Sequence, residues 1–365
     1  MSLITTDRLT DNQIRIDPGT TRIAGEGAAR ERDYKVFLVN VKKGDETEAY
    51  ALKAEEVTYN IKAQGVSTEE LYQRNVAVMW ALHEACENDF PKCRIVTDTK
   101  ELDVVLASLT NSQKPRFTPI ARPGECEGAN IAIWMLMEAF PDWHDFGEDE
   151  EADTKRREAF ARAAVSNLDF WKKLGVIAVL DMFLGNTDRF APIIGKHEKP
   201  SICKESNIIF NGKGPIGLDF FSNYAERMNN LYSPATLDDD VYFKDWDGFF
   251  LKETLTASDL KCFMWKISTD FLKTPIRTRK TNFANKVVHQ ITSLCDYVPI
   301  DEAALEYAKH FISGMSQAQI KIGKWTGAGT SNEKCSPEAE ALFNKIGGGR
   351  PAQLKIRYSA IWPGS

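Results

Sequence analysis

Apolar residues dominate two neighbouring stretches of the amino-terminal part of the chain, residues 34–41 and 48–54. The first stretch is rich in β-branched and aromatic side chains, and a Lys-Gly-Asp turn separates it from the second, which contains Tyr50 and Leu52. This pattern predicts a β-hairpin. Because successive side chains of a strand point to opposite faces, Ala49, Ala51 and Lys53 share one face, and the two small alanines leave space beside the lysine.

A helix and two further strands are predicted after this hairpin. Ser67 and Glu70 form a capping-box pattern, which indicates the start of a helix. The helix is expected to run to about residue 86, with core-facing side chains at helical spacing: Leu71, Val78, Met79 and Leu82. Residues 93–97 and 116–121 have the composition of strands, so they would complete a small antiparallel sheet.

The remainder of the chain is mainly helical in pattern. Residues 130–140 are strongly apolar, and their Trp and Met side chains at helical spacing indicate core packing. Residues 154–184 form a long helical pattern that becomes almost wholly apolar, which is typical of a buried helix, with a break expected at Gly175. Further helices are expected at residues 259–272, 281–297, 301–317 and 337–346.

Together these elements predict an α+β fold with two lobes. We expect residues 1–121 to form an amino-terminal lobe built on the small antiparallel sheet, and residues 122–365 to form a mainly helical carboxy-terminal lobe. The turn-rich stretch at residues 122–128 would be the crossing between them. A chain of 365 residues, of which 43% are hydrophobic, can bury one large core or two smaller ones.

Charge and cysteine content narrow the classes of protein. The formal net charge of −6 argues against a nucleic-acid partner, because proteins that bind phosphate backbones present excess Lys and Arg. The seven cysteines are scattered without zinc-type spacing, so reduced, structural thiols are expected. The chain has no secretory signal pattern and no apolar run long enough to span a bilayer. We therefore expect a cytoplasmic protein, or one delivered into a host cytosol without a classical signal peptide.

The most informative motif follows the long apolar helix. Its end leads into the polar turn Gly185-Asn186-Thr187-Asp188-Arg189. Residues 207–210 and 215–219 then predict a second hairpin, closed by a loop that contains glycine. Asn207 begins the first of these strands and Asp219 ends the second, so both are expected at the same edge of the hairpin.

These polar groups match the requirements of phosphoryl transfer. The reaction uses one group to accept or orient the proton of the nucleophile and two groups to hold metal ions on ATP. The segments Gly-Asn-Thr-Asp-Arg, Asn-Ile-Ile-Phe and Gly-Leu-Asp-Phe resemble motifs of the atypical kinases, namely the type II phosphatidylinositol 4-kinases, the secretory-pathway casein kinase group and the HipA-like bacterial toxins. The resemblance implies a bilobal, protein-kinase-like fold. It is specific at these short motifs and compatible with the rest of residues 20–320.

The resemblance also implies a role for each matching residue. Lys53 would pair with the phosphates of ATP, and Asp188 would be the catalytic base. Asn207 and Asp219 would hold Mg²⁺, or Mn²⁺ in its place. A non-catalytic pseudokinase is disfavoured because all four of these residues are present.

Two further parts of an ATP site are expected in the amino-terminal lobe. Gly25 and Gly27 could let backbone N–H groups approach phosphates, and the alternative is a flexible surface turn. A kinase also needs a helical carboxylate to hold its lysine, and Glu70 is our choice. Glu70 fits equally well as a capping-box acid alone, and Glu69 and Glu84 are alternatives.

The chain departs from the family pattern in ways that bear on the substrate. Phe190 stands where many relatives have His, and Phe221 replaces the glycine of Asp-Phe-Gly. We expect a protein substrate, because the acidic residues 238–240 do not suit an anionic lipid headgroup. We also expect a bacterial effector or toxin that acts inside a cell. The alternatives are a phosphoinositide kinase acting on a peripheral lipid, and nucleotidyl transfer (AMPylation) on the same fold. The lysine-containing residues 190–206 are either a surface loop or a basic insertion beside the active site.

Overall fold

The computed structural model describes the parts of the chain that build its principal elements. The described residues are 14–16, 22–23, 36–43, 45–58, 68–91, 93–96, 100, 103, 107, 126–127, 130–139, 158–159, 161–184, 208–210, 214–217, 284–285, 287–289, 291–292, 301–328, 335–346, 355 and 358. The chain divides into two compact units. The first comprises Met1–Ala77 and Pro91–Arg156, and the second comprises Val78–Phe90 and Arg157–Ser365. Each unit is described by itself below.

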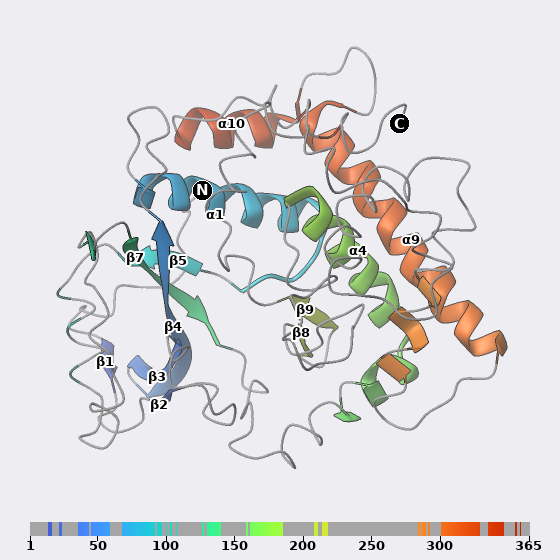
Figure 1. Cartoon of the computed structure of the whole chain (residues 1–365), viewed down its shortest axis with the longest axis horizontal. Coiled ribbons are helices and arrows are strands. Elements are labelled where there is room, and N and C mark those ends of the chain that lie inside the picture. Colours follow the sequence, from blue (N-terminus) through green and yellow to red (C-terminus); the bar gives the residue numbers. More distant parts are fainter. Residues whose placement is uncertain are drawn as a thin grey trace. The chain divides into compact units, whose positions relative to one another are not determined.

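The first unit contains an antiparallel sheet (Figure 1). Its main path follows the strand order β1-β3-β4-β7-β5, while β2 pairs with β3 and β6 pairs with β7, which gives seven strands among the described residues. The strands are β1 (Ile14–Ile16), β2 (Arg22–Ile23), β3 (Val36–Lys43), β4 (Glu46–Thr58), β5 (Cys93–Val96), β6 (Cys126–Glu127) and β7 (Asn130–Glu138).

The predicted hairpin is confirmed as β3 and β4. Val36 pairs with Lys53 at one end of the register, and Lys43 pairs with Glu46 beside the turn. The strand expected at residues 93–97 is confirmed as β5, whose four side chains are all buried. Residues 116–121, for which a strand was also predicted, lie outside the described residues.

The structure corrects the helical interpretation of residues 130–140. Residues 130–138 form strand β7, which pairs with β4 on one side and β5 on the other. Trp134 and Leu136 are buried, and so is Met135 on the opposite face of the strand. The prediction of core packing is therefore confirmed for these residues, but a strand buried on both faces produces a continuous apolar run that resembles a buried helix.

The division into units also differs from the expected lobe boundary between residues 121 and 122. Strand β6 lies within the expected crossing and pairs back onto β7, with Cys126 opposite Ile131. The chain thus returns to the sheet after residue 122, and the first unit extends to Arg156.

Helix α1 (Thr68–Ala85) confirms the helix predicted from the capping box. It begins at the residue after Ser67. Val78, Met79 and Leu82 are buried as expected, while the side chain of Leu71 lies outside the described residues. Residues up to Ala77 belong to the first unit, and those from Val78 belong to the second.

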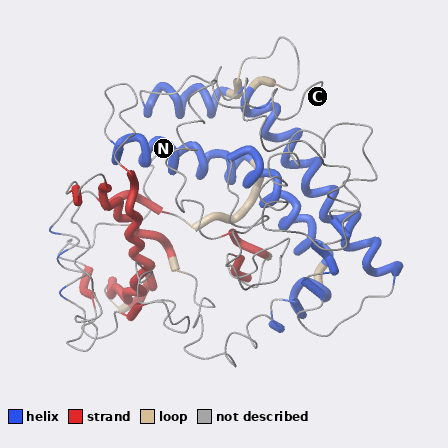
Figure 2. Tube along the Cα trace, in the orientation of Figure 1, coloured by secondary structure: helices blue, strands red, loops and turns tan. Residues whose placement is uncertain are grey.

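The second unit contains α4 (Leu168–Leu184), α9 (Asp301–Thr326) and α10 (Pro337–Ile346), as well as the small hairpin of β8 (Ile208–Phe210) and β9 (Pro215–Gly217). Figure 2 distinguishes these helices from the hairpin strands. The described residues thus form a mixed α+β structure with a small antiparallel sheet and helices. Among them, no helix is both long and apolar enough to cross a membrane.

The break in the long helical pattern lies at Asn167, and the predicted break at Gly175 is wrong. Helical residues 161–166 precede Asn167, and α4 follows it. The side-chain oxygen of Asn167 accepts a hydrogen bond from the backbone N–H of Asp169 at 2.9 Å. Asn167 therefore caps α4, because it satisfies a donor that a first helical turn leaves without a partner.

Gly175 has a different use, in the packing of α4 against α9. The two helices lie side by side (Figure 1). A Cβ added at Gly175 would lie 2.0 Å from the backbone oxygen of Phe311, and one at Gly314 would lie 1.9 Å from the backbone oxygen of Lys172. Both glycines thus permit a backbone-to-backbone approach that no other residue would allow.

Helix α9 runs nine residues beyond the predicted end at residue 317. Ile322 and Trp325 continue its buried face. The helix stops at Gly327, which has φ of +70°, and the N–H of Ala328 donates to the carbonyl of Gly323 at 2.8 Å. These are the features of a Schellman C-cap.

The boundaries predicted for α10 are confirmed, and Ser336 caps this helix through its hydroxyl. The described residues between 284 and 292 are helical, as expected. The helix predicted at residues 259–272 lies outside the described residues.

Candidate functional site

Lys53 lies on β4 between two neighbouring strands. It pairs with Val36 of β3 and Met135 of β7. Its side chain is partly exposed, whereas Ala51, two residues earlier on the same face, is fully buried. The face carrying Lys53 is thus covered at Ala51 and open at the lysine itself. A strand lysine in this position can meet a ligand while its neighbours remain packed.

The β8–β9 hairpin was predicted, and its register is now defined. Phe210 pairs with Pro215 beside the turn, and Ile208 pairs with Gly217 at the other end. Ile208 and Ile216 are buried, so the hairpin is held by its own apolar side chains. The chain enters β8 and leaves β9 at the Ile208–Gly217 end.

The expected metal ligands are neighbours in sequence of that end. Asn207 directly precedes β8, and Asp219 follows the last residue of β9 by two positions. Both residues lie outside the described residues. The described part of the chain contains no cluster of three or more His, Cys, Asp or Glu side chains that could hold a metal ion.

Helix α4 leads toward the expected catalytic base. It ends at Leu184, four residues before Asp188, which lies outside the described residues. The helix is buried over most of its length, including Phe170, Ile177 and Phe183. Its one buried carboxylate among the described positions, Asp181, has no exposed surface and does have an interaction partner. The sequence reasoning gave Asp181 no role.

For the remaining predicted site residues, Gly25, Gly27 and Glu70, the side chain or the whole residue lies outside the described part of the chain. Gly25 and Gly27 lie outside the described residues. Glu70 lies in the first turn of α1, on the helix that follows β4 in the chain, but its side chain is outside the described residues. The structure therefore defines the strand that carries Lys53 and the register of the β8–β9 hairpin. The expected contacts of these elements with ATP and Mg²⁺ stay predictions.

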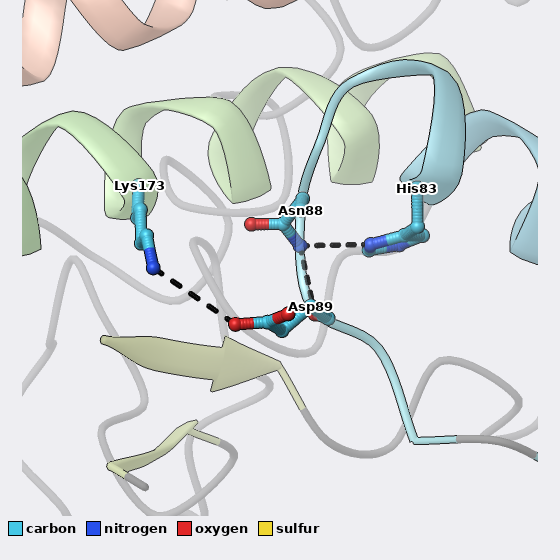
Figure 3. Close-up of polar contacts among 4 residues, drawn as sticks. All are labelled: His83, Asn88, Asp89 and Lys173. Carbon is cyan, nitrogen blue, oxygen red and sulfur yellow. Dashed lines mark hydrogen bonds and ion pairs between the residues drawn. The ribbon is translucent and has the colours of Figure 1, made fainter. Parts of the chain in front are cut away.

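A polar cluster at the end of α1 was not predicted (Figure 3). The side-chain amide of Asn88 donates to Nδ1 of His83 at 2.9 Å and to the backbone oxygen of Asp89 at 3.0 Å. The ring of Phe90 stacks on His83 with centroids 4.6 Å apart. His83 and Asn88 are buried, so these contacts fix the shape of the turn that follows the helix.

Two lysines from other helices reach this turn, which we define as residues 86–90. Lys173 of α4 lies 3.9 Å from a carboxylate oxygen of Asp89, and Lys321 of α9 lies 2.9 Å from one of Glu87. The turn is thus tied to both long helices of the second unit. Sequence reasoning had no signal for these pairs, because the partners are more than 80 residues apart in the chain.

Two described cysteines, Cys86 and Cys93, are buried and unreactive. Burial raises the pKa of the Cys86 thiol to about 12, and this effect exceeds the opposing attraction of Lys321. Burial also raises the pKa of Cys93 to about 12. Because a thiolate is the reactive form, both side chains remain inert thiols near neutral pH. Cys86, Cys93 and Cys335 are free, as the sequence predicted for these thiols.

Comparison with models of known protein families, with curated proteins and with solved structures found no match to this chain. An interpretation of its function therefore depends on its own motifs and on the geometry described above.

Proposed function

We propose that this protein is an ATP- and Mg²⁺-dependent phosphotransferase with a bilobal kinase-like fold, which transfers the γ-phosphate to a hydroxyl group of a protein substrate. The observation that carries the proposal is the register of the β8–β9 hairpin. Ile208 pairs with Gly217 at the open end of the hairpin. In the sequence, Asn207 directly precedes Ile208 and Asp219 follows Gly217 by two positions, so an amide and a carboxylate flank the same end of the hairpin. Oxygen donors of this kind suit Mg²⁺.

The amino-terminal sheet supports the same proposal. In protein kinases the ATP-binding lysine lies on a strand, and its glutamate partner lies on a helix of the same lobe. Here Lys53 lies on β4, and α1, with Glu70 in its first turn, is the next helix in the chain. The first unit contains both Lys53 and Glu70.

The helix before the catalytic motif supports a fixed position for the base. Helix α4 packs against both α9 and β9. A base that follows such a helix, and metal ligands that flank such a hairpin, would share one packed support. Positioning of this kind supplies much of the catalysis in phosphoryl transfer.

The first test measures ATP binding with and without Mg²⁺. The second follows labelled phosphate from ATP as it is transferred to protein, to lipid vesicles that contain phosphoinositide, or to water as released inorganic phosphate. We expect Mg²⁺-dependent ATP binding and labelling of protein. The Asp219→Ala variant should lose transfer, because the charge on the β- and γ-phosphates is then uncompensated. Asn207→Ala should lose less, since it removes a neutral ligand.

The mass added to the product separates the alternatives. A phosphoryl group on protein supports the proposal, a phosphoryl group on lipid replaces the substrate class, and a nucleotide on protein indicates AMPylation. Near-normal turnover by a folded Asp219→Ala variant would remove this residue from the site. No ATP binding by the wild-type chain would overturn the proposed function.

A further inference from the structure

The side chain of Lys173 links three elements of the second unit. It projects from the first half of α4 toward Asp89 on the turn of residues 86–90 (Figure 3). On the way it passes Gly214, which precedes β9. A Cβ added at Gly214 would lie 2.5 Å from Cδ of Lys173 and 3.1 Å from its Nζ. The aliphatic part of the lysine therefore lies directly against Gly214, at the turn end of the hairpin.

The contact with Gly214 matters more than the ion pair. The Lys173–Asp89 separation is 3.9 Å, and the Asp89 side chain is 53% exposed, so water screens much of the attraction. By contrast, Gly214 is buried, and its lack of a side chain is what gives Lys173 its path. The stem of the lysine packs, while its ammonium stays near the surface and fixes the direction of the side chain.

The link bears on the proposed site because of where the hairpin is held. Gly214 is at the turn end of the hairpin, and the sequence neighbours of the opposite end are Asn207 and Asp219. A hairpin with buried apolar strands transmits a displacement of its turn along its length. The same helix, α4, leads to Asp188 at its other end.

We propose that Lys173 is a positioning residue, which holds the loop of the β8–β9 hairpin on α4 and on the turn of residues 86–90, and thereby sets the position of the metal ligands. The role of Lys173 in metal binding rests on the proposed function. The mechanical link between Lys173 and the hairpin does not, because it concerns only described residues of one unit.

The first measurement is amide hydrogen exchange across residues 208–217 in the wild-type chain and in Lys173→Ala. We expect exchange in the hairpin to accelerate about 10-fold or more, while α9 keeps its protection, because local opening is governed by local contacts. Lys309→Ala is the matched control, since it removes an exposed lysine with a shorter ion pair, 2.6 Å to Glu306, far from the hairpin in sequence. Unchanged exchange in the hairpin of folded Lys173→Ala would overturn the link.

A double-mutant cycle tests the contact directly. Gly214→Ala in the wild-type background should displace Lys173, and the same change in the Lys173→Ala background should meet no such obstacle. We expect the destabilisation by Gly214→Ala to be clearly smaller in the second background, because any backbone strain at this position is common to both. Equal effects in the two backgrounds would overturn the contact. Asp89→Asn removes the ion pair and leaves the aliphatic stem of Lys173 in place. We expect it to accelerate hydrogen exchange in the hairpin less than Lys173→Ala does, and it allows the link to be tested if Lys173→Ala folds poorly.

The positioning role is tested by the Mg²⁺ concentration that gives half-maximal ATP binding. We expect Lys173→Ala to raise this concentration about 10-fold, at the lower end of the effects of outer-shell partners, and Lys173→Arg to restore it. Accelerated hairpin exchange with an unchanged Mg²⁺ requirement would overturn the positioning role and leave the proposed function standing. If the wild-type chain binds no Mg²⁺–ATP, the proposed function and the positioning role both fail, while hydrogen exchange still decides the mechanical link.

Discussion

Glu87 occupies a backbone conformation that glycine usually takes. Its φ is +53°, and it lies at the C-cap of α1, where the N–H of Asn88 donates to the carbonyl of His83 at 2.9 Å. The same hydrogen-bond arrangement ends α9, and there the corresponding residue is Gly327. The two helices thus end in the same motif, one with glycine and one with Glu87, whose carboxylate lies 2.9 Å from Nζ of Lys321.

We predict that Glu87→Val lowers the free energy of unfolding by about 1–2 kcal/mol, while Glu87→Gly changes it by less than about 1 kcal/mol. The left-handed conformation already costs Glu87 about 1–2 kcal/mol. A β-branched side chain adds to this cost, and valine also loses the ion pair with Lys321. Glycine removes this cost, but it adds about 0.5–1 kcal/mol of backbone entropy and loses an ion pair that contributes at most about 1 kcal/mol.

Denaturant unfolding of the three proteins checks this prediction, with Glu340→Val on the exposed face of α10 as the control for helix propensity. A Glu87→Val protein as stable as the wild type would show that the turn does not hold its backbone in this conformation.

Single residues also show which parts of the site the sequence could and could not predict. Lys53 was placed on a strand from the local composition of a hairpin, and that placement is confirmed. Lys173 was not singled out, because its importance depends on Asp89 and Gly214, to which no local pattern connects it. Functional residues that form a local motif can be predicted from a sequence, whereas contacts between residues far apart in the chain cannot.

The crossing of α4 and α9 depends on Gly175, at which the sequence predicted a break, and on Gly314, to which it gave no role. Glycine in a helix costs about 1 kcal/mol relative to alanine, so Gly175 suggested a break. The packed structure reverses that preference, because the missing side chains let the helices approach closely. Local propensity was overridden by a tertiary contact.

We predict that Gly175→Ala and Gly314→Ala each destabilise the protein, even though alanine favours helix. The new Cβ would lie about 2 Å from a backbone oxygen of the other helix, and backbone cannot move aside without separating the helices. Overpacking of a core costs about 1–3 kcal/mol, and we expect the upper end of this range.

Gly323→Ala is the matched control for these variants. Its Cβ would lie 2.8 Å from the hydroxyl oxygen and 3.0 Å from Cζ of Tyr358, so the new contact is with a side chain and not with the backbone of a helix. We expect a loss below about 1 kcal/mol, measured by the same thermal or denaturant unfolding. Similar losses in all three variants would mean that the glycine positions of α4 and α9 are not special.

Strand β7 shows the limit of periodicity at the level of an element. Its apolar residues face both sides of the sheet, so no apolar-polar alternation distinguishes this strand from a buried helix. Capping residues define such boundaries more directly. Ser336 and Asn167 cap the starts of α10 and α4, and Gly327 ends α9, but the boundaries were predicted without these residues.

The proposed site needs groups from both units of the chain. Lys53 falls in the first unit, and Asp188, Asn207 and Asp219 fall in the second. The proposed activity thus requires residues of both units, and it can be measured separately from the thermal stability of the whole chain. This separation makes it possible to distinguish a catalytic residue from a structural one by measuring both quantities on one preparation.

We predict that Asp188→Asn retains ATP binding and thermal stability but reduces phosphate transfer by at least about 10²-fold, the usual scale for loss of a positioned base. Asparagine keeps the size and hydrogen-bonding capacity of the side chain and removes its basicity. Lys53→Ala is the informative partner, because it should weaken ATP binding itself while the buried strand positions around it, such as Ala51 and Leu52, preserve the sheet.

The two variants separate chemistry from binding only if Asp188 acts as the base. If Asp188 instead stabilises the turn after α4 or pairs with Arg189, its amide variant should melt at a lower temperature and still transfer phosphate at a rate near that of the wild type. A stable, ATP-binding and inactive Asp188→Asn protein would identify the carboxylate with proton transfer, since the loss would then appear in turnover without a loss in the affinity for ATP.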